Sequence, residues 1–553
     1  MTKINLASYF QAQGYGKEQY QYIKNPPEMN DKWRLNDIKK AIQLIDKASK
    51  ITIIGDYDTD GITATTIAYL GLKRAGKNVE FYVPNRFTDG YGLNINLVKK
   101  AHENGSDTIL TVDNGIAAYD AIKAAKDEYN MTVIVTDHHN IKRIPPADAI
   151  VHPAMGNYPF ANISGCQVAY KLIMALFETH DISDEDLERY FLQLSSISIV
   201  SDVMPIASIN MDVNENRKWL IDGLNSLNKA PDQHFVRLAR HFDFMIFDET
   251  VLGFYIIPCI NAVGRLADAT FAVNYFICND RGKIYAMASK MYALNEKRKE
   301  LVDVQLRHHN PVYSPEKKAV FVVGDDIHEG IAGLIAGKHS SGLGTVSFCF
   351  TRVKKPNGDV FYKGSGRNDT SAHLIEDILN CIPEGIIVGY GGHKDACGLS
   401  IKADRMNDFI RYAGKFADEK AVSNVPYIID TDDESFLQVS KLVRSFKPFG
   451  NGFTAPVINT DVRLKNIMTT LSGCVKVTGV IGDTRIDIWL READSKLYER
   501  LESIKDTKTF PTGAVTYYLK NEHMNVTMEL AYTPKKTEQK FEMSYNGLKA
   551  DFA

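Results

Sequence analysis

The sequence lacks a long hydrophobic run, and its first residues lack the pattern of a secretion signal. No stretch of about 18 apolar residues occurs, the length that a membrane-spanning helix requires. Residues Met1 to Gln11 contain no basic segment followed by an apolar one. We therefore expect a cytoplasmic protein without a transmembrane helix.

Paired cysteines are also missing. None of the seven cysteines belongs to a Cys-x-x-Cys pair, which argues against a disulfide framework and against a structural zinc site. We expect buried, reduced thiols. The cysteines are Cys166, Cys259, Cys278, Cys349, Cys381, Cys397 and Cys474.

A strong net charge is absent as well. The chain has 65 Lys and Arg against 68 Asp and Glu, which gives a net charge of −3. Nucleic-acid-binding proteins are often basic overall, so a polyanion site here requires a local groove of Lys and Arg. The net charge alone neither supports nor excludes nucleic acid as a ligand.

The 553 residues are too many for one core, and their patterns predict several domains. Short β-branched runs that alternate with amphipathic helical stretches predict an open α/β domain with a parallel sheet covered on both faces. These runs are 51–55, 79–83, 108–112, 132–136 and 149–151.

The rest of the chain predicts a helical region over 271–309, a second α/β unit and an antiparallel β region. The second unit has expected strands at 319–323, 345–350, 359–363 and 397–401. Five later runs suit a small barrel of the oligonucleotide-binding (OB) type, although the pattern alone does not fix that topology. They are 457–464, 475–481, 485–490, 514–518 and 526–531.

Acidic residues and histidines follow three strands of the first predicted sheet. The first strand leads into Asp56, Asp58 and Asp60, the third into Asp113, and the fourth into the run 137–139, Asp-His-His. Ligands bind outside the carboxyl ends of strands in such sheets, so we expect these side chains to meet at one edge.

Carboxylates this close together repel one another unless a cation neutralises them. Several Asp with one or two His form a mostly oxygen ligand set, suited to Mg²⁺ or Mn²⁺. Two ions about 3.5–4 Å apart would activate a water and stabilise both oxygens of a phosphoryl displacement. Taken singly, Asp60 could be only a helix N-cap and His138–His139 only surface residues, but three such strand ends together favour a metal site.

The motifs resemble those of the DHH phosphoesterase superfamily, in its RecJ branch. The resemblance begins with Asp-Tyr-Asp-Thr-Asp-Gly at 56–61, Val-Asp-Asn-Gly-Ile at 112–116 and Thr-Asp-His-His at 136–139. It extends over about residues 50–530. Further matching segments are 84–92, 201–203, 260–266, 328–333, 364–367, 391–393 and 447–450.

The resemblance implies an α/β fold with a DHH domain, a helical connector, a DHH-associated domain and an OB-type barrel. It places metal ligands at Asp58, Asp60, Asp113, His138 and Asp202, with Asp113 as the bridge between the ions. Asp56 and His139 complete the catalytic group as further ligands or as groups that orient them. Many relatives have a His where this chain has Ile54, which predicts a weaker site for the first metal.

The resemblance also predicts domain boundaries and residues that hold the substrate. The expected phosphate and DNA contacts are Arg86, Tyr91, Arg265, Ser365, Arg367 and His393, while His328 is balanced between this role and a turn role. The expected units are 1–47 (N-terminal segment), 48–205 (DHH domain), 206–312 (helical connector), 313–410 (DHH-associated domain), 411–535 (OB-type domain) and 536–553 (polar tail).

The implied activity is a 5′→3′ exonuclease that is specific for single-stranded DNA and releases 5′-mononucleotides, in DNA repair, recombination or replication. A single-strand-binding protein or a helicase is a possible type of partner. One alternative is a shorter-substrate enzyme of the same superfamily, acting on oligonucleotides, cyclic dinucleotides or pyrophosphate. A replication-fork scaffold protein that has lost its metal ligands is the other.

Overall fold

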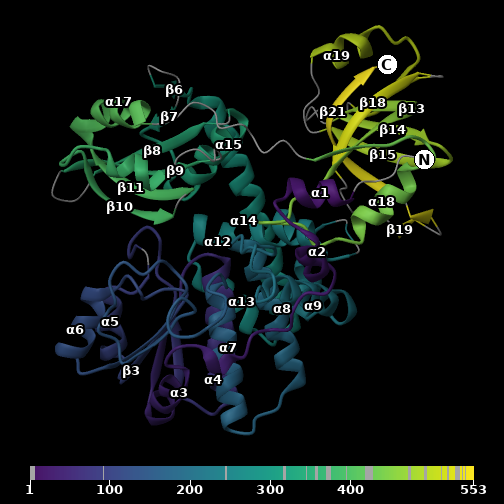
Figure 1. Ribbon diagram of the computed structural model, residues 1–553. Helices are drawn as coiled ribbons and strands as arrows, with labels where there is room; N and C mark the ends of the chain where they lie inside the picture. The colour runs from purple at the N-terminus through teal and green to yellow at the C-terminus, as the bar shows by residue number, and fades with distance from the viewer. Residues whose placement is uncertain are drawn as a thin grey trace.

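The structure is a computed structural model in which two α/β units and a β-barrel surround a helical centre (Figure 1). Among the described residues, no helix is both long and apolar enough to cross a membrane. The structure describes the chain outside residues 1–5, 91, 243, 245, 315–318, 344, 355–358, 369–374, 394, 417–426, 471–474, 491–494, 512–513, 520–521, 530–535, 538–539, 542 and 553.

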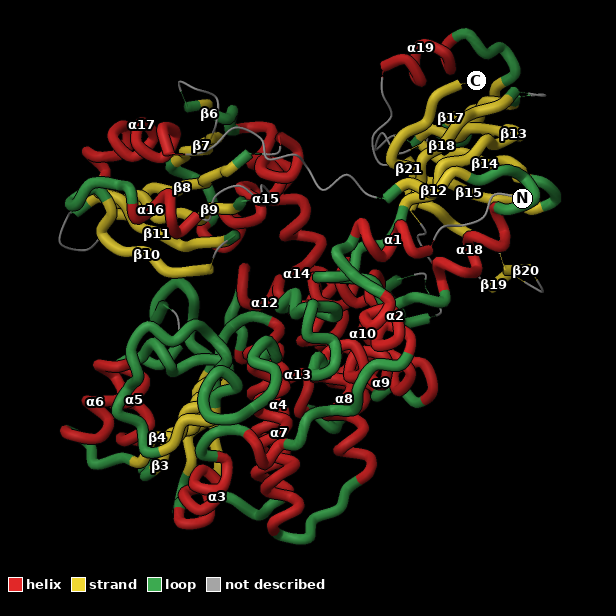
Figure 2. Tube along the Cα trace, viewed as in Figure 1, coloured by secondary structure: helices red, strands yellow, loops and turns green. Residues whose placement is uncertain are grey.

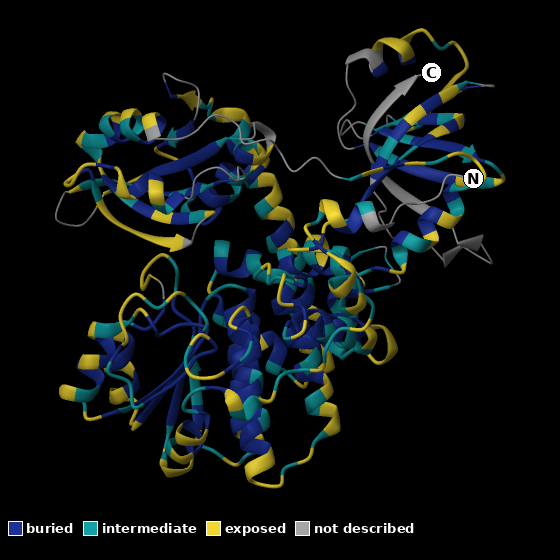
Figure 3. Ribbon diagram, in the orientation of Figure 1, coloured by how far each residue is buried: buried dark blue, intermediate teal, exposed yellow. Residues whose placement is uncertain are grey.

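The first sheet is entirely parallel, in the order β2-β1-β3-β4-β5, and all five predicted strands are confirmed. Its central strands are mostly dark blue in Figure 3, because helices cover both faces, whereas the edge strand β2 is only partly buried. The strands are β1 (Ile51–Ile54), β2 (Val79–Tyr82), β3 (Thr108–Val112), β4 (Thr132–Thr136) and β5 (Ala149–Val151).

Alternate residues of these strands pack into two different cores. Ile53 and Leu110 belong to the core under α3, α4 and α7, whereas Ile54 and Ile109 belong to the core under α5 and α6 (Figures 1 and 2). The helical elements up to this point are α1 (Leu6–Ala12), α2 (Lys17–Lys24), η1 (Lys32–Arg34), α3 (Ile38–Lys47), α4 (Thr59–Arg74), α5 (Ile95–Glu103), α6 (Tyr119–Asp127) and α7 (Gly165–Thr179). Of these, α1 and α2 lie beside the helical centre and not on the sheet (Figure 1).

The helical centre follows, and its last helix, α14, leads to the second α/β unit (Figure 1). The helical stretch predicted over 271–309 is confirmed as α13 and α14. The elements are α8 (Glu185–Ser201), α9 (Asn216–Lys229), α10 (Gln233–Ala239), α11 (Glu249–Val251), the π-helix η2 (Leu252–Ile256), α12 (Ile257–Leu266), α13 (Thr270–Ile277) and α14 (Arg281–His308).

The second unit contains a mixed sheet in the order β10-β11-β9-β8-β7-β6, in which only β7 and β8 pair in parallel. The four predicted strands are present, and β6 and β10 are additional. The elements are β6 (Val312–Tyr313), β7 (Ala319–Gly324), η3 (Glu329–Ile331), α15 (Ala332–Leu343), β8 (Val346–Lys354), β9 (Val360–Arg367), α16 (Ile375–Asn380), β10 (Ile387–His393), β11 (Ala396–Lys402), η4 (Ala403–Arg405) and α17 (Met406–Phe416).

The C-terminal strands close into a ring. Strands β14, β15, β21, β18 and β13 pair in this order, and β13 pairs again with β14, while β15 and β21 run parallel. The elements are β12 (Ile428–Asp430), α18 (Phe436–Arg444), β13 (Val457–Thr469), β14 (Val475–Ile481), β15 (Thr484–Leu490), α19 (Ser495–Glu502), β16 (Thr507–Thr509), β17 (Val515–Tyr518), β18 (His523–Glu529), β19 (Lys536–Thr537), β20 (Lys540–Phe541) and β21 (Met543–Phe552).

This ring is the five-stranded closed barrel expected of an OB-type domain, with one correction to its membership. The five predicted runs correspond to β13, β14, β15, β17 and β18, but the strand that closes the barrel is β21. Part of the predicted polar tail, 536–553, is therefore a barrel strand. Polar side chains do not prevent this, because pairing with β15 and β18 satisfies the backbone.

Candidate metal centre

The first acids lie at the start of α4, directly after β1. Asp58 caps this helix, and its Oδ1 accepts a hydrogen bond from Gly61 N at 3.1 Å. Asp60 lies in the first turn and accepts bonds from Gly165 N at 2.8 Å and from Ser198 Oγ at 2.7 Å. The cap role considered for Asp60 therefore belongs to Asp58, whose other carboxylate oxygen is not used by the cap.

Asp113 follows β3 in a strained conformation. Its φ of 60° lies in the left-handed region, which a residue with a Cβ rarely adopts. The start of α7 approaches it so closely that a Cβ on Gly165 would lie 2.4 Å from Asp113 Oδ1. Strain of this kind concentrates at functional sites, where the surrounding structure holds the residue in place.

His138 brings the acids from separate elements together. Its Nε2 lies 3.2 Å from Asp113 Oδ1, 3.5 Å from Asp202 Oδ2 and 3.7 Å from Asp60 Oδ2. Within the described part of the chain, three sets of ligand atoms lie inside 4.8 Å of one another. The sets are Asp113, His138 and His139; Asp60, His138 and Asp202; and Asp56, Asp58 and Asp113.

These residues fit divalent cations. Asp56 Oδ1 and His138 Nε2 are buried without a hydrogen-bond partner among the described residues, which is costly unless a ligand occupies the site. Burial and the charges of neighbouring acids raise the pKa of Asp56, Asp113 and Asp202 well above the ordinary value. A bound cation would reverse this effect, because it stabilises the ionised carboxylates.

Asp137 orients the second histidine and is the residue that motif reasoning left without a role. Its Oδ1 lies 2.7 Å from His139 Nδ1 and also accepts from His138 N at 2.7 Å, while its Oδ2 accepts from Ile116 N. Burial would lower the pKa of His139, but the hydrogen bond and charge of Asp137 raise it to about 9. The signal in the sequence was the position of Asp137 between the strand end and the two histidines.

Ile54, the departure from the pattern of many relatives, is fully buried in β1 and packs in the core under α5 and α6. It therefore supplies no ligand. The backbone oxygen of Ile54 instead accepts a hydrogen bond from Asn114 Nδ2 at 2.9 Å. Asn114 Oδ1 accepts from Leu93 N at 3.1 Å, so this side chain connects the end of β1 with the loops after β2 and β3.

Three of the predicted phosphate contacts form a cluster of arginines beside the acids. Burial and the charges of Arg86 and Arg367 lower the pKa of Arg265 to about 9. The guanidinium of Arg86 lies 4.2 Å from the ring centre of Tyr57, next to Asp56 and Asp58. Arg265, from α12, also donates to Gly330 O of the second unit at 3.1 Å.

Ser365 and Arg367 reach the same region from β9 of the second sheet. A Cβ on Gly333 would lie 2.6 Å from Arg367 Nη2 and 3.5 Å from Ser365 Cβ, so both residues face the start of helix α15, which contains Gly333. Arg367 Nη1 donates to Gly366 O at 2.7 Å. Tyr91 lies outside the described residues, and so does the side chain of His393, whose backbone belongs to β10.

Two contacts connect the first and second units on either side of the acids. The ring of Phe87, after β2, meets the ring of His328 edge-on at 5.5 Å. Beyond β4, Lys142 Nζ lies 3.2 Å from Glu376 Oε1 of α16. Sequence reasoning did not identify Phe87, Lys142 or Glu376, because their partners lie more than 200 residues away in the chain.

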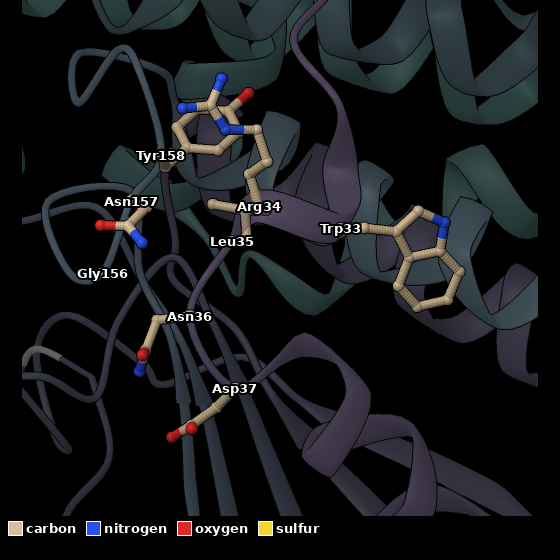
Figure 4. Close-up of a pocket in the computed structure, with 8 residues that line it drawn as sticks. All are labelled: Trp33, Arg34, Leu35, Asn36, Asp37, Gly156, Asn157 and Tyr158. Atoms are coloured by element: carbon tan, nitrogen blue, oxygen red, sulfur yellow. The ribbon is translucent and has the colours of Figure 1, made fainter.

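A pocket of about 790 Å³ lies elsewhere, between the N-terminal segment and the loop after β5 (Figure 4). Its polar groups serve structural contacts: Asp37 Oδ2 accepts from Ile150 N at 3.1 Å, and Tyr158 donates to Glu215. The lining residues are Trp33, Arg34, Leu35, Asn36, Asp37, Gly156, Asn157 and Tyr158.

Comparison with known proteins agrees with this geometry. The model of the DHH family, N-terminal domain, matches residues 50–199, which include β1 to β5. The single-stranded-DNA-specific exonuclease RecJ of Escherichia coli is 29% identical over 469 residues, 78% of this chain and 79% of that protein. RecJ of Thermus thermophilus is 28% identical over 432 residues, 76% of this chain and 61% of that protein.

Solved structures show the same fold. The crystal structure of Thermus thermophilus RecJ in complex with Mn²⁺ has a TM-score of 0.75 at 22% identity, covering 98% of this chain and 77% of that one. An exonuclease RecJ bound to manganese has a TM-score of 0.58 at 27% identity, covering 71% of this chain and 96% of that one. Residues 50–199 therefore match the DHH family, and the chain is similar in sequence to RecJ exonucleases over about three quarters of its length.

Proposed function

We propose that this protein is an exonuclease that degrades single-stranded DNA in the 5′→3′ direction and releases 5′-mononucleotides. The observation that carries the proposal is the meeting of two groups of opposite charge. Acids and a second histidine from four segments, which follow β1, β3, β4 and α8, surround His138, and the arginines 86, 265 and 367 gather beside them. One group suits divalent cations, and the other suits the phosphates of a nucleic acid.

The proposed metal ligands are Asp58, Asp60, Asp113, His138 and Asp202, with Asp56 and His139 adjacent to them. When bound, two Mn²⁺ or Mg²⁺ ions supply the chemistry that activates water and stabilises the charge of an in-line phosphoryl displacement. Asp113 and His138 each have a place in two of the three ligand sets, and of the two we propose Asp113, a carboxylate with two oxygens, as the ligand that both ions would share.

The proposed role of the arginines is to hold the terminal phosphate in line for attack. Arg265 and Arg367 present planar guanidinium groups that can bind phosphate through two hydrogen bonds each, and Ser365 adds a hydroxyl donor. Neither needs to move a proton. Burial lowers the pKa of both guanidinium groups, and the pKa of Arg265, at about 9, is still above neutral pH. Arg86 would contact the same phosphate or the next one.

Selection of a single strand follows from the contacts that join the two units beside the acids. The Phe87–His328 pair and the Lys142–Glu376 pair bound the region on its two sides. A duplex is broader than a single strand and would have to break these contacts. We therefore expect that only an unpaired end reaches the metal centre.

The barrel is proposed to bind the strand without taking part in the chemistry. Lys465 and Tyr518 are exposed, and Leu519 N donates to Lys465 O, so the two side chains come from adjoining strands. Two other candidates are less available: Lys476 is paired with Asp487 at 2.6 Å, and Tyr517 packs against the barrel core. Lys520 lies outside the described residues.

Two other functions remain as alternatives. A phosphodiesterase for oligonucleotides or cyclic dinucleotides would have the same metal centre, but the barrel and the long helix α14 favour a polymer. A scaffold protein would have lost ligands, whereas all the expected acids and histidines are present here. A role in repair, recombination or replication, a single-strand-binding protein or helicase as partner, and a cytoplasmic location stay predictions from the family resemblance.

One experiment tests the proposed function. A long single strand carrying a 5′-phosphate is incubated with the protein and Mn²⁺, with the label at the 5′ end or at the 3′ end. We expect the 5′ label to appear at once as mononucleotide and the 3′ label to stay in long products until late. The reverse order would refute the polarity, and hydrolysis restricted to dinucleotides would favour the phosphodiesterase.

A further inference from the structure

The segment that precedes the barrel, residues 446–454, packs with the catalytic part of the chain. We call it the lead-in. Phe446 and Phe453 are buried in the core shared with the first sheet and the helical centre, whereas β13 onward has a separate core. Tyr9, near the N-terminus, donates its hydroxyl hydrogen to Thr454 O at 2.6 Å. The lead-in thus lies within the predicted barrel domain, 411–535, but contacts the other units.

The turn after α8, which carries the proposed ligand Asp202, is strained. Val203 has a φ of 51°, in the left-handed region that is most unfavourable for a β-branched residue. Side-chain packing does little to offset this strain, because Val203 is 63% exposed. Hydrogen bonds to the backbone of the turn must therefore hold this conformation.

Two of these hydrogen bonds come from one residue of the lead-in. Asn451 Nδ2 donates to Val203 O at 2.7 Å, and Ile206 N donates to Asn451 O at 2.9 Å. Within the turn, Met204 N donates to Ile199 O at 2.9 Å. Asn451 thus contacts Val203 itself and Ile206, three residues farther along the same loop.

A second contact of the lead-in reaches the helix that carries Arg265. Lys447 Nζ lies 2.7 Å from Asp248 Oδ2 and 3.3 Å from Glu249 Oε1, at the start of the helical run α11–η2–α12. Farther along that run, Asn261 Oδ1 accepts a hydrogen bond from Thr59 N, between Asp58 and Asp60. The lead-in is therefore attached to two elements that end at the metal centre.

We propose that Asn451 is a positioning residue that holds the Asp202 turn in its metal-binding conformation. The inference rests on the proposed function, because Asp202 is a proposed metal ligand. Without the side-chain bond, Val203 leaves the left-handed region more readily, and Asp202, its neighbour, moves with it. The same residue connects the chain of the barrel to the metal centre, so a change in the barrel's position can reach Asp202 through a single side chain.

The test measures Mn²⁺ binding by isothermal titration calorimetry on the full chain without substrate. Asn451→Ala should raise the dissociation constant for Mn²⁺ about fivefold, the effect of losing one net hydrogen bond. Asn451→Asp, which keeps the shape but cannot donate, should raise it at least as much. The matched control is Asn459→Ala, which removes a 2.8 Å bond to Asp430 within the barrel region and should leave Mn²⁺ binding unchanged.

A second variant separates positioning from general destabilisation. Glycine adopts a φ near +51° without steric cost, so the turn no longer needs Asn451 when residue 203 is glycine. In a Val203→Gly background, Asn451→Ala should therefore have much less effect on Mn²⁺ binding than in the wild-type chain.

The outcomes are distinct. Wild-type Mn²⁺ affinity in both Asn451 variants would overturn the inference and leave the metal centre intact. An undiminished effect of Asn451→Ala in the Val203→Gly background would also overturn it, because the loss would then not act through the turn. Absence of Mn²⁺ binding by the wild-type chain would overturn the metal centre itself, and the inference with it.

Discussion

Two groups of opposite charge meet at the metal centre, and they draw on different parts of the molecule, although Arg86 of the basic group follows β2 of the parallel sheet. The parallel sheet contributes acids from the loops after β1 and β3, and the mixed sheet contributes Arg367 from β9, close to Arg265 of α12. Within each group the like charges repel one another. The pKa of Asp113 is raised by burial and, to a smaller extent, by the neighbouring acids, and the pKa of Arg265 is lowered by burial and, to a smaller extent, by the neighbouring arginines. The difference indicates two ligands of opposite charge, cations on one side and phosphate on the other.

We expect the largest effect on activity from a substitution in the acidic group. Asp113→Ala should lower the rate of strand hydrolysis by several orders of magnitude, because the proposed shared ligand of two cations would be lost. The measurement is release of mononucleotide from a labelled strand in Mn²⁺. The circular dichroism spectrum and melting temperature should show a folded protein, and turnover like that of the wild type would refute the metal assignment.

We expect a smaller effect on activity from a substitution in the arginine cluster. Arg367→Ala should lower kcat/KM on a 5′-phosphorylated strand by about 10- to 100-fold, as expected for loss of one or two charge-assisted hydrogen bonds. The preference for a 5′-phosphate over a 5′-hydroxyl should fall with it. Arg367→Lys keeps the charge but not the planar fork, so it should restore only part of the activity. An unchanged 5′-phosphate preference in Arg367→Ala would exclude this role.

The barrel should affect affinity and leave the chemistry intact. Combining Lys465→Ala with Tyr518→Ala should weaken binding to a long single strand about tenfold or more and reduce its salt dependence. Hydrolysis of a very short oligonucleotide should persist. The control is Lys476→Ala, which should matter less because Asp487 already pairs with this lysine. Equal losses from the control and the double variant would argue against a specific binding surface.

The smallest effect is expected from the exposed ion pair between the two units. Lys142 is 70% exposed and Glu376 is 38% exposed, and such a pair contributes about 0–1 kcal/mol. Lys142→Ala should therefore change single-strand hydrolysis by less than about fivefold. The rate at which the Lys142→Ala variant hydrolyses a blunt duplex, measured in parallel, tests whether this ion pair contributes to the selection of single strands. Efficient duplex degradation by the variant would show that this one contact excludes the duplex.

Much of the first domain could be predicted because its signals are local. The five strands of the parallel sheet are short apolar runs, and a strand buried on both faces needs apolar side chains at every position. The acids after β1 and β3 follow directly from the strand ends. Strands β10 and β21 were not predicted, because the glycines of one and the polar residues of the other do not give a strand pattern.

The sequence by itself determined the parallel sheet and the residue types at its edge, because strand formation and strand-end position depend on neighbouring residues. Only the tertiary structure decided how distant segments complete the site. It placed Asp202, which follows α8, and Arg265 of α12 beside the acids, and it placed Asn451 against the strained turn at Val203. Such contacts join residues far apart in the chain, and no local pattern encodes them. They form only when the separate cores pack together.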